Sequence, residues 1–89
     1  MAMYLISYDL IKNKDYKKLY EAIMSYQQYA HITDSLWAIV SSKKAVEIIN
    51  FLTKYIDNDD VLFVCEINGE AAWLNLNKDV SDWLKKMYS

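Results

Sequence analysis

Alternating and continuous apolar runs along the chain predict its strands. A short apolar run bounded by polar residues is typical of a strand, and apolar residues on both sides of the run indicate that both faces are covered. Runs of this kind predict strands at Met3–Leu10, Tyr29–Thr33, Leu36–Ser41 and Val61–Ile67.

Two longer stretches have the spacing of amphipathic helices instead. Within Asp15–Gln27, apolar residues recur every three or four positions, which places them on one helix face. The same spacing predicts a second helix over Ala45–Ile56, with Ser42 as its N-cap. Toward the C-terminus, the pattern predicts a short segment at Ala71–Leu76 and a last helical turn or two from Ser81.

The order of these elements predicts an α+β fold. Strand, helix, strand, strand, helix and strand, followed by a short C-terminal tail, is the βαββαβ order of a ferredoxin-like domain. In that fold, two helices cover one face of a four-stranded antiparallel sheet. The chain has no proline, one glycine and no low-complexity tract, so residues 1–89 are expected to form a single domain.

Both faces of the predicted sheet are apolar. In the last strand, Val61 and Phe63 lie on one side, and Leu62 and Val64 lie on the other. An antiparallel sheet with one wet face would alternate polar and apolar residues, and the two helices can cover only one face. The tail is one possible cover for the second face. A second copy of the chain, forming a two-fold homodimer, is the cover that we expect.

Composition narrows the possible partners. The chain contains no apolar run long enough to span a membrane and no secretory signal, so a cytoplasmic protein without a membrane partner is expected. All ten basic residues are lysines, and the net charge is −2. Because arginine supplies the bidentate contacts of specific nucleic-acid recognition, strong general binding to nucleic acid is disfavoured. A local lysine patch could still attract an anion.

Asp9, near the end of the first strand, is the first residue that could carry chemistry. At the edge of a dimer interface it could meet its symmetry mate, and two carboxylates could hold one divalent cation such as Mg²⁺. Alternatively, Asp9 accepts hydrogen bonds from backbone N–H groups of the turn that follows, which is the more common use of such a residue.

His31 is the only histidine, and it lies close to Asp34 and Ser35 in the sequence. It could act as a general base or acid near neutral pH. A Ser-His-Asp arrangement is a weaker hypothesis, because the three residues belong to one strand-turn-strand stretch without a nucleophile elbow. The simpler interpretation is a strand histidine whose ring bonds to a neighbouring hydroxyl or carbonyl group.

Aromatic and lysine side chains near these residues are possible ligand contacts. Tyr8 and Trp37 could stack on bases, although aromatic residues more often fill a core or an interface. Lys12 and Lys14 follow Asp9 and could attract a phosphate, or they could simply form a solvated loop.

The acidic run at Asp57, Asp59 and Asp60 lacks the spaced ligands, the glycine and the closing glutamate of a calcium loop. We expect this run to form a turn.

Several stretches resemble one family. "MYLISYDL", an amphipathic helix, "HITDSLWAIVSS", a second helix and "DDVLFVCEINGEAAW" resemble the small CRISPR-associated protein two family, nearest its stand-alone SinR-like and VapD-like relatives. The residues that carry the resemblance are Tyr8-Asp9, His31, Ser35, Trp37 and Ala71–Trp73. The CRISPR branch usually has arginines soon after the acid, where this chain has Ile11–Lys14.

The resemblance implies a ferredoxin-like homodimer. It also implies that Asp9 is the family's acid, proposed to bind magnesium across the dimer axis for phosphodiester cleavage, and that Ser35 matches a polar residue of the third strand.

Three functional hypotheses follow. The first is a divalent-metal-dependent nuclease or phosphodiesterase, with Asp9 from two chains as ligands and His31 or Ser35 in a secondary role. The second is a non-catalytic dimeric module that binds RNA, DNA, a small nucleotide or a protein. The third is a metal-free ribonuclease that uses His31.

Overall fold

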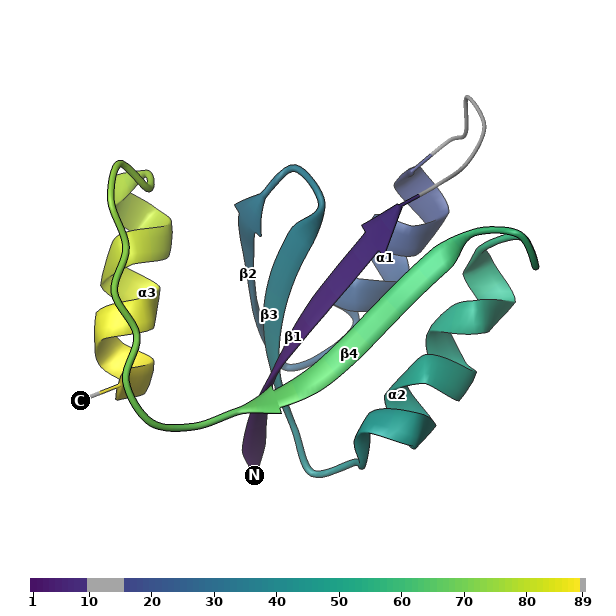
Figure 1. The fold of residues 1–89 in the computed structure, drawn as a ribbon, viewed down its shortest axis with the longest axis horizontal. Helices are drawn as coiled ribbons and strands as arrows, with labels where there is room; N and C mark the ends of the chain where they lie inside the picture. The colour runs from purple at the N-terminus through teal and green to yellow at the C-terminus, as the bar shows by residue number, and fades with distance from the viewer. Residues whose placement is uncertain (10–15, 89) are drawn as a thin grey trace.

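The computed structural model, which describes residues 1–9 and 16–88, contains one four-stranded antiparallel sheet. Its strand order is β2-β3-β1-β4, so that β1 lies between β3 and β4 (Figure 1). All four strand predictions are confirmed, with ends that differ by at most one residue in the described part. The strands are β1 (Ala2–Asp9), β2 (Gln28–Thr33), β3 (Leu36–Ser41) and β4 (Val61–Ile67).

Two helices pack on one face of the sheet. These are α1 (Lys17–Met24) and α2 (Ala45–Leu52), and a single 3-10 turn, η1 (Thr53–Tyr55), continues α2. Each is shorter than the stretch predicted from periodicity, and the predicted start of the first helix at Asp15 lies outside the described residues.

The N-cap prediction for α2 was wrong. The cap is Lys44, whose backbone is extended, and not Ser42. Glu47 reaches back from the first turn and accepts the Lys44 backbone N–H at 2.9 Å. This bond satisfies one of the donors that a helix start leaves unpaired, so a serine cap is not required.

The C-terminal tail forms a third helix, α3 (Lys78–Tyr88), which is longer than the turn or two expected from Ser81. It begins earlier because Asn77 caps it: the Asn77 side-chain oxygen accepts the Val80 N–H at 2.9 Å. The segment at Ala71–Leu76 forms neither helix nor strand. The fold is therefore α+β with a third helix, and it is compatible with the predicted ferredoxin-like arrangement.

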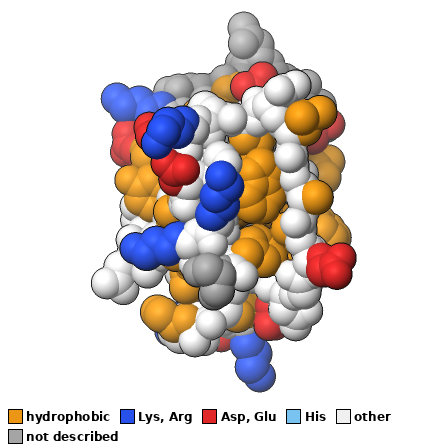
Figure 2. All heavy atoms as spheres, turned by 90° about the vertical axis from the view of Figure 1, so that its left-hand side faces the viewer, with side chains coloured by type: hydrophobic (Ala, Val, Ile, Leu, Met, Phe, Trp, Pro, Cys, Tyr) orange, Lys and Arg blue, Asp and Glu red, His pale blue; other side chains and the backbone are white. Residues whose placement is uncertain are grey.

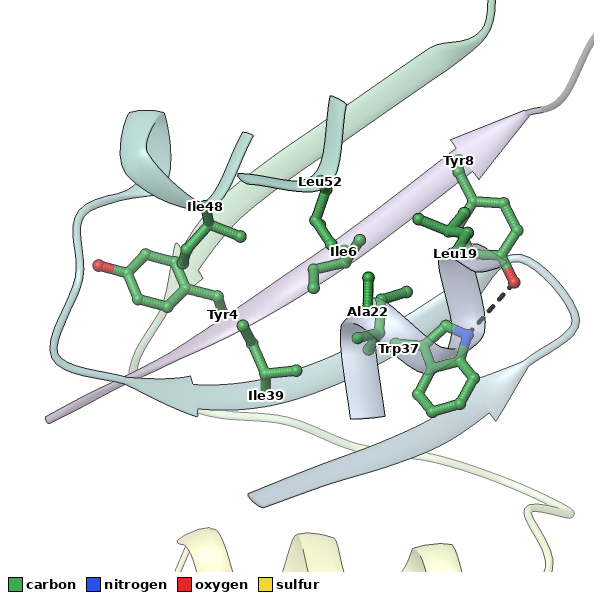
Figure 3. Packing of buried hydrophobic residues seen from close by; sticks show 10 residues of the cluster. Tyr4, Ile6, Tyr8, Leu19, Ala22, Trp37, Ile39, Ile48 and Leu52 are labelled. Atoms are coloured by element: carbon green, nitrogen blue, oxygen red, sulfur yellow. Dashed lines mark hydrogen bonds between the residues drawn. The ribbon is translucent and has the colours of Figure 1, made fainter. Parts of the chain in front are cut away.

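The core lies between the sheet and the first two helices (Figure 3). Alternation along β1 turns Tyr4, Ile6 and Tyr8 toward this side, as it does Trp37 and Ile39 of β3. From the helices, the buried residues that meet them are Leu19, Ala22 and Ile23 of α1 and Ile48 and Leu52 of α2.

The second face of the sheet is covered over only part of its width. Helix α3 lies beside β2 (Figure 1), where Ala30 and Ala38 are buried and Leu84 of α3 is buried too. Figure 2, which looks onto the α3 side, shows a hydrophobic strip with charged side chains gathered mainly along one side of it. On β4, by contrast, Val61 is 52% exposed and Phe63 is 60% exposed. The tail therefore supplies some of the expected cover and leaves β4 open.

Within the described part of the chain, no helix is both long enough and apolar enough to cross a membrane.

Candidate functional site

Asp9 is the last residue of β1 and is exposed. Strand alternation places it with Leu5 and Ser7 on the second face, the face opposite α1 and α2. It pairs in register with Val61, the first residue of β4. Asp9 therefore lies on the same sheet face as the exposed apolar side chains of β4.

The acidic run that precedes β4 forms a turn, as predicted. The Asp57 N–H donates to the Asp60 carboxylate at 2.8 Å, and the Asp60 N–H donates to the Asp57 carbonyl at 3.2 Å. One carboxylate oxygen from each of Asp57, Asp59 and Asp60 lies within 4.8 Å of the others. Because Asp60 directly precedes Val61, the β1–β4 register brings this turn to the sheet end that carries Asp9.

Sequence reasoning missed this proximity of Asp9 to the acidic turn. The signal that could have found it is the pairing of β1 with β4. In an antiparallel pair, the end of one strand meets the start of the other.

His31 lies on the helix side of the sheet and packs flat against Trp37. The two rings are 4.1 Å apart between centroids and inclined by 8°. Nε2 of His31 lies 3.2 Å from the backbone carbonyl oxygen of Asp34. The interpretation of His31 as a strand histidine that bonds to a neighbouring carbonyl is confirmed. The Ser-His-Asp arrangement is not formed, because the histidine meets the backbone of Asp34 and not its carboxylate.

The Asp34 carbonyl is the centre of a small polar cluster. The Tyr8 hydroxyl donates to it at 2.7 Å, and the Tyr20 hydroxyl lies 3.5 Å away. The indole N–H of Trp37 donates in turn to the Tyr8 hydroxyl at 3.2 Å. Among the described residues that are not exposed, every buried side-chain nitrogen and oxygen has a hydrogen-bond partner. This cluster anchors the β2–β3 turn to the core.

Ser35 is exposed in the β2–β3 turn. Its backbone carbonyl accepts the Tyr8 N–H at 3.2 Å, so the backbone of Ser35 extends the pairing of β1 with the turn. His31 belongs to β2 and lies on the opposite side of the sheet from the Asp9 carboxylate, whereas Ser35 belongs to the turn that follows β2.

Tyr8 and Trp37, the two rings expected to stack on a ligand, are each only 3% exposed. Their rings pack in the core (Figure 3), so neither offers a face to a base. Burial also raises the pKa of the Tyr8 hydroxyl well above its usual value, which keeps this group a hydrogen-bond donor. Lys12 and Lys14 lie outside the described residues.

These positions separate two kinds of chemistry. Asp9 offers hard oxygen ligands on the open face, close to an acidic turn, which suits a divalent cation. His31 is held by ring stacking and a backbone bond on the other face, where it supports the turn.

No family model, no curated protein and no solved structure matches the chain.

Proposed function

We propose that this chain is a homodimeric, ferredoxin-like protein of the CRISPR-associated protein two type, and that it cleaves phosphodiester bonds with a divalent cation held by Asp9 of both copies. The observation that carries the proposal is that Asp9 is exposed on the same sheet face as the uncovered apolar residues of β4.

The proposed homodimer is supported by the exposure of apolar side chains on β4. Val61 and Phe63 are large apolar residues that remain more than half exposed on an edge strand. Neighbouring apolar exposure of this kind is typical of a surface that meets a partner. A two-fold axis through this face brings the same residues of the two copies together, and a residue near the axis meets its own symmetry mate.

The cation part follows from the donor set. Asp9 by itself supplies one carboxylate per chain, which is a sparse site, and a two-fold pair of Asp9 residues doubles these ligands while water completes the shell, as Mg²⁺ prefers. When bound, the cation supplies Lewis-acid polarisation of a phosphodiester. Asp9 holds and orients it, and the nearby acidic turn adds negative potential that favours cation entry.

His31 has no direct part in this proposal, because its ring lies on the other face of the sheet and is already engaged by Trp37 and the Asp34 carbonyl.

A second candidate is a dimeric module that binds RNA, DNA, a nucleotide or a protein without cleaving it. One observation favours it: His31, the only histidine of the chain, lies on the opposite face of the sheet from Asp9 and so is not placed to act as a general base there.

The test is cleavage of a labelled single-stranded RNA with Mg²⁺ and with EDTA. Asp9→Asn keeps the size of the side chain but loses the charge that binds a hard cation, so it should lower the rate by roughly 100-fold or more. His31→Ala should lower it far less. Thermal unfolding of both variants controls for folding.

Cleavage that survives EDTA and Asp9→Asn but disappears in His31→Ala would support the metal-free ribonuclease instead. RNA binding by the wild-type protein without any cleavage would support the binding module.

A further inference from the structure

The outer side of the helix layer contains a groove that the proposed function does not use. Two adjoining hollows lie between α1 and α2, with cavity volumes of about 310 Å³ and 520 Å³. Ser25 and Phe51 line both, so the two hollows adjoin, and we call them together the α1–α2 groove. Hollows of this size are in the range of small-molecule sites.

Aromatic rings line this groove. Tyr26 and Phe51 meet edge to face with their centroids 5.9 Å apart, and Phe51 meets Tyr55 at 5.5 Å. Tyr26 and Phe51 are half-buried, and Tyr55 is exposed, so part of each side chain remains accessible. Rings that are fixed by their neighbours and still accessible are suited to stacking on a flat ligand, because little ordering is needed on binding.

Lysines surround the rings. Lys18, Lys43 and Lys54 line the groove, and Lys54 Nζ lies 5.9 Å from the centre of the Phe51 ring. Two acids, Glu21 and Glu47, also line the groove, and Glu47 accepts the Lys44 backbone N–H. The lining is therefore positive by charge count, although the whole chain carries −2. A lining with more lysines than acids favours an anion.

We infer that the α1–α2 groove binds a mononucleotide, with its base against Phe51 and Tyr26 and its phosphate near Lys18 and Lys54. A ligand with a flat ring and a separate dianionic group matches the two features of this groove at once. An apolar peptide would leave the lysines unused, and inorganic phosphate would leave the rings unused.

The hydroxyl of Tyr26 adds a polar contact. Burial raises the pKa of this group, so it remains protonated at neutral pH and can donate to a base or a ribose. The groove lies on the other side of the sheet from Asp9, so the inference does not depend on the nuclease proposal.

The test is a titration of the ¹⁵N-labelled protein with adenosine monophosphate, adenosine and inorganic phosphate, followed by amide chemical shifts. Adenosine monophosphate should shift the amide signals of residues 18–26 and 43–55. It should bind at least about fivefold more tightly than adenosine or inorganic phosphate, because only adenosine monophosphate contacts both the rings and the lysines. No shift at millimolar concentration, or shifts confined to β1 and β4, would overturn the inference.

Variants then assign the contacts. Lys54→Gln should weaken binding of adenosine monophosphate by about fivefold, and Phe51→Leu, which keeps an apolar side chain, by about tenfold. Lys85→Gln on α3 is the matched control and should leave the affinity unchanged. Lys54 is exposed, so its variant should fold even if Phe51→Leu does not. Equal affinity in Lys54→Gln and the wild type would contradict the assigned phosphate position.

Discussion

At the scale of single residues, Tyr8 joins the core to the β2–β3 turn. Its ring packs among the buried side chains, its hydroxyl donates to the Asp34 carbonyl, and the same hydroxyl accepts the Trp37 N–H. One oxygen thus satisfies two partners that are far from Tyr8 in the sequence. Removing it leaves the Trp37 N–H buried without an acceptor.

Tyr8→Phe should therefore lower the free energy of unfolding by about 1–3 kcal/mol at neutral pH, the usual cost of an unsatisfied buried donor. Chemical denaturation measures this change. Tyr29→Phe, at a residue that is 41% exposed, is the control and should cost much less. An equal loss of unfolding free energy in the two variants would show that the hydrogen bonds of the Tyr8 hydroxyl do not stabilise the fold.

The same substitution should change the pH dependence of stability. Burial raises the pKa of folded Tyr8, whereas the unfolded residue titrates near the ordinary tyrosine pKa of 10.0. Above that pH the unfolded state loses this proton and the folded state keeps it, so the stability contributed by Tyr8 is complete below pH 10.0 and falls as pH rises further. Denaturation at rising alkaline pH should show a shallower decline for Tyr8→Phe than for the wild type.

At the scale of elements, the stability of α3 depends on the hydrogen bonds at its N-terminus. Asn77 caps the helix through its side chain, and its carbonyl accepts the Ser81 N–H at 3.0 Å. The Trp73 indole N–H also donates to the Ser81 hydroxyl at 3.0 Å, which ties the preceding segment to the first turns of the helix. The ion pair of Lys78 and Asp82 is exposed and adds little by comparison.

Asn77→Ala should destabilise α3 by about 1 kcal/mol, because the Val80 N–H loses its acceptor. Hydrogen exchange of the α3 amides should become faster, while exchange in β1 and β3 stays as in the wild type. Asn77→Asp keeps a capping oxygen and should retain most of the protection. A loss in Asn77→Asp as large as in Asn77→Ala would contradict the capping role.

At the scale of the whole molecule, the open part of the second sheet face decides the oligomeric state. Phe63 and Val46 are both 60% exposed, but Phe63 lies on β4 at the proposed interface and Val46 lies on α2. The two positions therefore form a matched pair for a charge substitution.

Phe63→Glu should convert a dimer to a monomer, because an unpaired charge buried in an interface costs several kcal/mol. Val46→Glu should remain dimeric. Light scattering coupled to size-exclusion chromatography measures the mass of each. A wild-type protein that is monomeric at micromolar concentration would contradict the proposed homodimer and, with it, the shared Asp9 site.

Much of the local structure follows from the sequence by itself. Alternation located all four strands, the helical period located the cores of α1 and α2, and polar residues located the turn at Asp57–Asp60. The reason is that side-chain direction repeats every two residues in a strand and about every 3.6 residues in a helix. Burial of one face therefore requires apolar residues at the same spacing in the sequence. The position of Asp9 at the end of a strand is one of these local results.

Only the tertiary structure decided which residues act together. It separated Asp9 from His31 by the thickness of the sheet, placed Tyr8 and Trp37 in one hydrogen-bonded core cluster, and brought Lys18 of α1 and Lys54 beyond α2 to one groove. It also showed that α3 covers the β2 side and leaves Phe63 open. Periodicity states which face a residue occupies, but what lies against that face depends on pairing and packing between segments far apart in the chain.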